Sequence, residues 1–144
     1  MTWVSEKYSK SLDWLMESPP AGLRYLVMRN LLKYPEESEE LADARKTAYK
    51  HGPIGEILSE MNELGYWVKP EAGYHPQYRS TAWAISLLAQ LGASTAYDER
   101  VSKACEYMLD LSLTSDGRFS KTSPGAPSGN IDCLQGMILS ALQI

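Results

Sequence analysis

The sequence predicts an all-α protein of about seven helices, arranged as antiparallel pairs. Two stretches, 81–91 and 131–142, are apolar on nearly every side, and a helix with so little polar surface has to be surrounded by other protein. A glycine followed two positions later by an aromatic residue also occurs twice, 52 residues apart: Gly65 and Trp67, then Gly117 and Phe119. This recurrence is typical of a helical repeat.

Four helices are expected before Gly65. The first covers 4–17 and is ended by the Ser-Pro-Pro run at 18–20, because proline cannot continue a helix. A second covers 21–34, up to Pro35. The third begins at the cap Ser38, with glutamates in its first turn and basic residues in its last, and the fourth covers 54–64.

Three further helices follow the first glycine. An apolar helix is expected over 77–91, and Asp98 is a plausible cap for a helix over 98–112 that is apolar on one side only. After a long loop rich in turn residues, the last apolar helix covers 131–142. The half-polar helices at 54–64 and 98–112 each precede an apolar one, so the pattern predicts an outer and an inner layer of paired helices. We expect five apolar side chains to be buried: Trp83, Leu87, Leu88, Leu134 and Ile138.

Composition narrows the classes of partner. Lys and Arg number 14 and Asp and Glu 18, for a formal net charge of -4, and no basic cluster of the kind that neutralises phosphates is present. We therefore expect no nucleic-acid partner. The longest apolar run is well short of the ~20 residues of a membrane span, so we expect a soluble, cytoplasmic protein of one domain, 1–144. Cys105 and Cys133 are too few for a disulfide framework, and we expect reduced thiols.

The order helix, Gly-x-aromatic, loop, apolar helix resembles the prenyltransferase and squalene-oxidase repeat. Four segments carry the resemblance: Gly65-Tyr66-Trp67, Asp116-Gly117-Arg118-Phe119, Tyr78-Arg79-Ser80-Thr81-Ala82-Trp83 and Cys133-Leu134-Gln135-Gly136. That repeat builds the α/α-toroid of squalene-hopene cyclases and protein prenyltransferase beta subunits. The resemblance covers 54–142 and departs from the motif at Met61 and Leu113, where the family has a glutamine. It implies part of an α/α-toroid, and 144 residues supply about half of the usual ring, so we expect a fragment or partial ring of a longer protein.

The resemblance also suggests one metal site to consider. The acidic Asp-x-Asp-Asp run of the cyclases does not occur here. In protein prenyltransferases an Asp and a Cys at the start of an inner helix help to hold zinc, and Asp132-Cys133 resembles that pair. Here the two residues are adjacent, so on a helix they point about 100° apart. The alternative is that Asp132 caps the helix and Cys133 is a small buried residue, so no cofactor is expected and zinc is the alternative.

A second candidate site lies where the first apolar helix begins. His75, Tyr78 and Arg79 could bind an anion such as a diphosphate, and Trp83 could line an apolar pocket. The alternative is that the histidine and arginine are ordinary loop residues and the tryptophan is core. The expected ligand is an apolar or isoprenoid small molecule.

Two functions remain open. The first is a non-catalytic binding or scaffold module, which the absence of an acidic run and of a correctly spaced metal set favours. The alternative is an enzyme for isoprenoid or other apolar ligands, with a site in the toroid cavity completed by residues beyond 144; no catalytic residue is identified. Because 131–142 is so apolar, we expect either self-association through that helix or further repeats of a longer protein that cover it.

Overall fold

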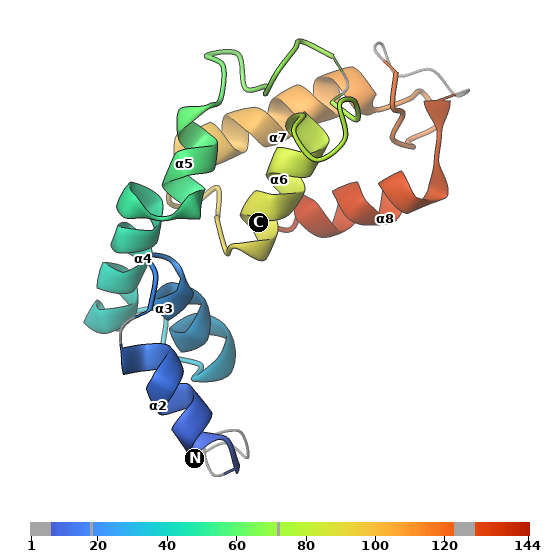
Figure 1. The fold of residues 1–144 in the computed structure, drawn as a ribbon. Helices are drawn as coiled ribbons and strands as arrows, with labels where there is room; N and C mark the ends of the chain where they lie inside the picture. Colours follow the sequence, from blue (N-terminus) through green and yellow to red (C-terminus); the bar gives the residue numbers. More distant parts are fainter. Residues whose placement is uncertain (1–6, 18, 72, 123–128) are drawn as a thin grey trace. The chain divides into compact units, whose positions relative to one another are not determined.

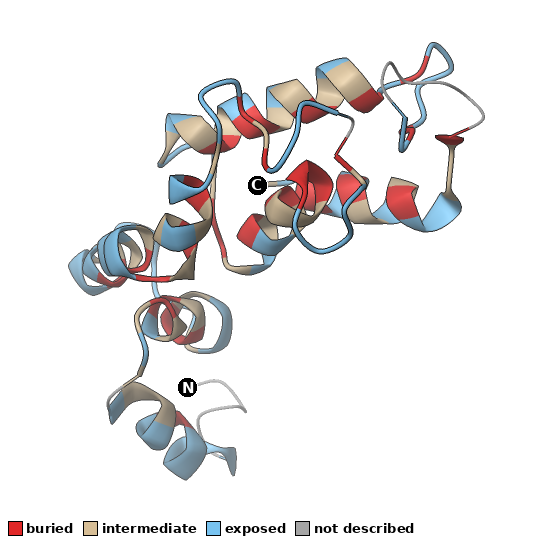
Figure 2. Cartoon of the chain, turned by 45° about the horizontal axis from the view of Figure 1, so that its top comes forward, coloured by how far each residue is buried: buried red, intermediate tan, exposed pale blue. Residues whose placement is uncertain are grey.

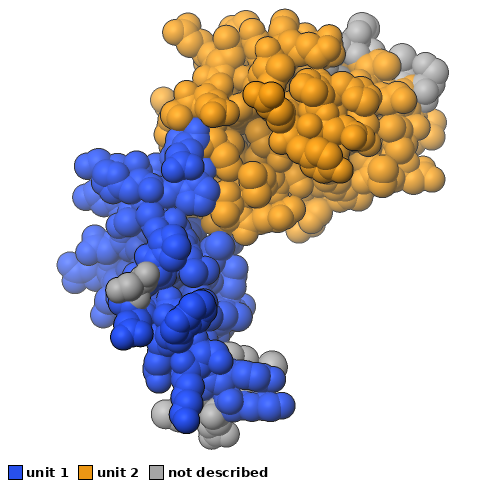
Figure 3. All heavy atoms as spheres, viewed as in Figure 1, with its two compact units in different colours: residues 1–56 blue, residues 57–144 orange. Residues whose placement is uncertain are grey.

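A computed structural model of the chain describes residues 7–17, 19–71, 73–122 and 129–144. Within these residues the protein contains seven α-helices and one π-helix, with two isolated β-bridges and no strand (Figure 1). The prediction of an all-α fold of about seven helices is confirmed. The chain divides into two compact units, 1–56 and 57–144, which are coloured separately in Figure 3. Each unit is described by itself.

The first helix described in unit 1 is α2 (Ser9–Glu17). It belongs to the helix predicted over 4–17, of which residues 4–6 lie outside the described part. The helix predicted over 21–34 is shorter and consists of two parts, α3 (Leu23–Leu26) and the π-helix η1 (Val27–Leu31). In η1 the wider turn is closed by the amide of Leu32, which donates to the Val27 carbonyl at 2.9 Å.

The third helix of unit 1, α4 (Glu39–His51), has the ends that the sequence predicts. The Leu41 amide donates to Ser38 Oγ at 3.3 Å, which confirms the cap. Helix α3 packs against both α2 and α4. The core of this unit consists of apolar side chains from these elements and from the residue after Pro53: Leu12, Tyr25, Val27, Met28, Leu41, Ala44, Ala48 and Ile54.

Helix α5 (Pro53–Ser59) begins in unit 1 and ends five residues earlier than predicted. Unit 2 then contains α6 (Thr81–Gln90), α7 (Glu99–Ser112) and α8 (Asp132–Ala141). The Arg100 amide donates to Asp98 Oδ1 at 2.9 Å, so the predicted cap of α7 is confirmed. Helix α6 packs against both α7 and α8 (Figure 1). In the described part of the chain no helix has the length and apolar character needed to span a bilayer.

The apolar helices of unit 2 are covered on one side more than on the other (Figure 2). Leu88, Leu134 and Ile138 are buried as predicted, whereas Trp83 is half-buried and Leu87 is 46% exposed, so the prediction is wrong for these two. The reason is that the packed face of α6 is formed by other positions: Thr81, Ala82, Ile85 and Leu88. An apolar sequence all round a helix therefore does not require burial all round it.

The 52-residue recurrence folds as a pair of matching turns. In the first turn the Asn62 amide donates to the Tyr66 carbonyl at 2.8 Å, and the Gly65 amide donates to the Asn62 carbonyl at 2.9 Å. In the second turn the equivalent bonds join Thr114 to Arg118 at 2.8 Å and Gly117 to Thr114 at 2.9 Å. Both glycines have positive φ angles, 99° and 81°, which favour glycine.

The aromatic residue after each turn is buried and attached to the following apolar helix. Trp67 is 3% exposed and its backbone amide donates to Thr81 Oγ1 at 3.1 Å. Phe119 is 4% exposed, and its amide donates to Gln135 Oε1 at 2.7 Å while its carbonyl accepts from Gln135 Nε2 at 2.6 Å. A polar side chain near the start of α6 or α8 thus holds the backbone of each aromatic residue.

Candidate ligand-binding surface

The loop that precedes α6 folds back onto the start of the helix. The Ser80 hydroxyl lies 2.7 Å from the Gly73 carbonyl and 2.8 Å from the Pro76 carbonyl, and the Ala82 amide donates to the Gly73 carbonyl at 2.9 Å. Gly73 has a φ of 79°, and a Cβ there would lie 2.6 Å from Thr81 Cβ, so only glycine fits this close approach. The helix therefore begins at Thr81 and not at 77 as predicted.

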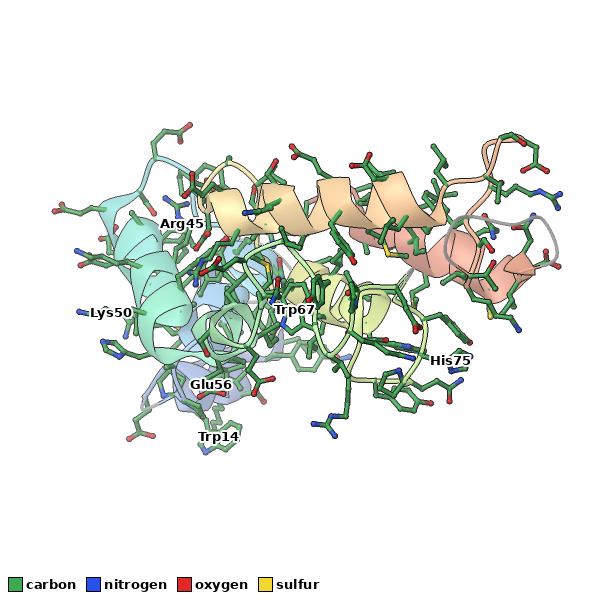
Figure 4. All side chains as sticks on the ribbon, turned by 90° about the horizontal axis from the view of Figure 1, so that it is seen from above. Trp14, Arg45, Lys50, Glu56, Trp67 and His75 are labelled. Atoms are coloured by element: carbon green, nitrogen blue, oxygen red, sulfur yellow. The ribbon has the colours of Figure 1, made fainter. Side chains whose placement is uncertain are left out.

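This loop brings aromatic rings together on Trp83. The Trp83 indole N–H donates to the Tyr74 carbonyl at 3.0 Å. The Tyr78 ring centroid lies 4.7 Å from that of Trp83, and the Tyr74 centroid lies 5.9 Å from it. The His75 ring meets Tyr74 edge to face at 4.9 Å. We call these four residues, Tyr74, His75, Tyr78 and Trp83, the aromatic surface; Figure 4 shows His75 at the outer edge of its loop.

Tyr78 is the unusual member of the aromatic surface. It is 77% exposed and its φ is 65°, in the left-handed region where a side chain with a Cβ costs roughly 1–2 kcal/mol. A bulky residue kept in this conformation gains little from burial here. Strained residues of this kind concentrate at ligand-binding and active sites. Its neighbours Gln77 and Arg79 are exposed as well.

The structure therefore brings together three of the four residues predicted for a ligand site, His75, Tyr78 and Trp83, and places exposed Arg79 next to Tyr78 in the chain. Tyr74 joins them. The signal in the sequence was the run of aromatic and planar polar residues from 74 to 79, but it did not show that Tyr74 lies against Trp83.

The residues predicted for the alternative zinc site lie at the start of α8. Asp132 and Cys133 are both exposed. The capping position is taken by Ile131, and no side-chain bond caps the helix. The alternative interpretation, a capping Asp132 and a buried Cys133, is therefore wrong, because Ile131 stands at the capping position, Asp132 is the first residue of the helix and Cys133 is exposed. Among the described residues no three His, Cys, Asp or Glu side chains lie close enough together to hold a metal ion.

Shifted pKa values occur away from the aromatic surface and have local causes. The hydrogen-bonded Arg100 guanidinium lowers the pKa of Asp98, and Arg118 together with Thr114 lowers the pKa of Asp116 to about 2. Burial raises the pKa of the Cys105 thiol to about 11. These shifts belong to a helix cap, a turn and a packed helix side, which are structural settings.

Unit 2 also contains a groove. It lies between the end of α5 and the first half of α7, over Leu58 and Met61. Its polar side chains carry both signs of charge, from Glu63, Glu99, Arg100, Lys103 and Glu106. One arginine and one lysine stand beside three glutamates, so the charges of the groove do not favour one class of ligand.

Comparisons of the chain with known proteins found no match. No family model matches the chain, and no curated protein or solved structure matches it.

Proposed function

We propose that this chain is a non-catalytic binding module of a helical-repeat protein, and that the aromatic surface binds its ligand. The observation that carries the proposal is the Tyr78 ring, which is 77% exposed while it lies against Trp83. Exposed aromatic rings offer a large contact area and lose little conformational entropy when a ligand binds. The toroid-like arrangement of the wider protein is part of the proposal, and the matching turns at Gly65 and Gly117 support it.

The hydrogen bonds that hold the loop around Tyr78 favour a binding role. The loop is tied to α6 by the Ser80 hydroxyl and the Ala82 amide, and Trp83 is fixed by its bond to the Tyr74 carbonyl. A surface that is ordered before the ligand arrives avoids part of the entropic cost of binding. The expected small-molecule ligand therefore contacts a prepared surface.

The test is a titration of the nitrogen-labelled protein with small probes, among them geraniol as a short isoprenoid. We expect at least one probe to shift the Trp83 indole N–H signal and the amides that begin α6. The Tyr78→Ala variant should lose these shifts, whereas Tyr97→Ala, at another exposed tyrosine of unit 2, should retain them. If no probe shifts the Trp83 signal at millimolar concentration, the proposal is wrong.

Self-association through 131–142 is the second part of the proposal. Leu139 is 59% exposed on α8, and a Cβ added to Gly136 would meet no atom within 4 Å, so a second helix has room to approach there. In sedimentation at micromolar concentration we expect an oligomer that Leu139→Ser weakens. Leu64→Ser, at a leucine 63% exposed in a turn, is the matched control. A strictly monomeric unmodified protein would rule out this part.

A cytoplasmic location completes the proposal. Both cysteines are free thiols, the state that a reducing compartment maintains.

A further inference from the structure

We propose that the aromatic surface recognises a sugar ring of a neutral oligosaccharide, with the Tyr78 ring as the platform. This inference rests on the proposed binding function and names the class of ligand. Nucleic-acid bases stack on exposed aromatic rings, but a net charge of -4 without a basic cluster does not fit a polyanionic partner. Four other classes of ligand also contact exposed aromatic side chains: organic cations, proline-rich peptides, extended apolar chains and sugars. The geometry around Trp83 separates them.

An organic cation needs rings that surround it. Such a cation lies over a ring face within about 6 Å of the centroid and gains most when several faces enclose it. Here the Tyr78 and Trp83 centroids are only 4.7 Å apart, at an interplanar angle of 49°, so the two rings contact each other and leave no gap between them. Exposed Arg79, next in the chain, also brings a positive charge close to the platform.

A proline-rich peptide needs a slot between rings and a donor for its carbonyl groups. The contact between Tyr78 and Trp83 closes the slot. The natural donor, the Trp83 indole N–H, is already bonded to the Tyr74 carbonyl at 3.0 Å. A peptide would therefore meet neither of the two features that this kind of recognition uses.

An extended apolar chain needs enclosure on most of its surface. Pockets that hold apolar ligands bury about 70–90% of the ligand surface. Tyr78 instead lies on the outside with 77% of its surface exposed, and a flat platform covers one face of a ligand and leaves the other in water. A ligand that fits has one apolar face and a polar rim.

A pyranose ring has this form, because C–H groups gather on one face and hydroxyl groups project around the edge. The apolar face packs on the Tyr78 ring through many small dispersion contacts. The hydroxyl groups need donors and acceptors at the rim, and planar polar side chains provide both. His75, Gln77 and Arg79 are exposed beside the platform and present imidazole, amide and guanidinium groups.

The experiment compares oligosaccharides with the other three classes on one protein. Cellohexaose, maltohexaose and chitohexaose are titrated separately into the labelled protein, followed by tetramethylammonium, oligoproline and geraniol. We expect at least one hexasaccharide to shift the Trp83 indole signal with a millimolar dissociation constant. Tyr78→Ala should weaken this binding roughly tenfold, which is the lower end of the effect of removing a ring that stacks on a nucleic-acid base.

Two further variants separate the platform from a general loss of fold. Tyr78→Phe keeps the ring and is expected to bind the same hexasaccharide within about threefold of the unmodified protein. Tyr97→Ala removes another exposed tyrosine of unit 2 and should leave binding unchanged. Sugar binding that survives Tyr78→Ala would overturn the inference.

The comparison probes distinguish the inference from the function on which it rests. If tetramethylammonium, oligoproline or geraniol shifts the Trp83 signal and no hexasaccharide does, the sugar inference is wrong and the binding function stands. If none of the six probes shifts it, both are wrong.

Discussion

Truncation of Trp67 tests the packing of unit 2 directly. The side chain, labelled in Figure 4, belongs to the core of unit 2. It is 3% exposed, and its indole Nε1 donates to the Ile57 carbonyl at 2.8 Å. Trp67→Ala removes this buried ring, and such truncations cost about 3–5 kcal/mol of the free energy of unfolding. That is a large share of the stability of a small domain, about 5–15 kcal/mol.

Two comparison variants divide this cost into its parts. Trp67→Phe keeps most of the apolar ring and leaves the Ile57 carbonyl without its donor, so a loss of about 1–3 kcal/mol is expected. Trp14→Ala makes the same change at a side chain that is 72% exposed, and should stay within about 0.5 kcal/mol.

The assay is urea unfolding followed by circular dichroism, which reports on the helices and not on the tryptophans themselves. The reasoning fails if Trp67→Ala loses less than ~1 kcal/mol, since a ring that is only 3% exposed and bonded to the Ile57 carbonyl cannot be removed at so small a cost. It also fails if Trp67→Phe and Trp67→Ala are equally destabilised, because packing would then contribute nothing beyond the hydrogen bond.

Two further predictions each compare two residues of the same type in unit 2. Gly65→Ala is expected to lower the free energy of unfolding by about 2–5 kcal/mol, and Gly117→Ala by about 1–2 kcal/mol. Both glycines have positive φ, but of the two only Gly65 has a backbone atom close to an added Cβ, the Lys103 carbonyl oxygen at 2.8 Å. Equal losses of stability in urea unfolding would contradict this. Iodoacetamide near neutral pH should alkylate exposed Cys133 more than roughly tenfold faster than Cys105, since burial raises the Cys105 pKa to about 11 and the thiolate is the reactive form. Mass spectrometry of the two peptides measures the ratio, and faster modification of Cys105 would refute it. Because the folded-state pKa is raised, the neutral Cys105 thiol stabilises the fold below the unfolded pKa of about 8.5, and this stability is lost as the pH rises toward 11.

Features that depend on neighbouring residues were predictable from the sequence. Ser38 and Asp98 cap their helices as expected, because a cap needs only its own side chain and amides two or three positions later. The glycine and aromatic residue of each turn were also identified, since the turn needs a positive φ at one fixed position.

Features that depend on distant contacts were not predictable. Periodicity over 21–34 looks the same for an α-helix and for one that widens into the π-helix η1, because one extra residue in a turn leaves the apolar pattern almost unchanged. The start of α6 was placed too early, because the Ser80 hydroxyl and Ala82 amide that tie down the loop bond to residues four to nine positions away. The aromatic surface was predicted in part, from composition, but ring contacts cannot be deduced from the order of residues.

The side chains that hold the two buried aromatic residues differ in kind. Thr81 offers one oxygen to the Trp67 amide, whereas Gln135 offers both an acceptor and a donor to Phe119, from a position 16 residues further on and not 14. The two halves of unit 2 thus share a requirement of the main chain. The backbone amide of the aromatic residue needs a hydrogen-bond acceptor where one helix leads to the next. Different residues at shifted positions meet this requirement equally well, so the two copies can diverge in sequence while the geometry of their junctions is kept. Related repeats would then be recognised more readily by their hydrogen-bonded turns than by the identity of their residues.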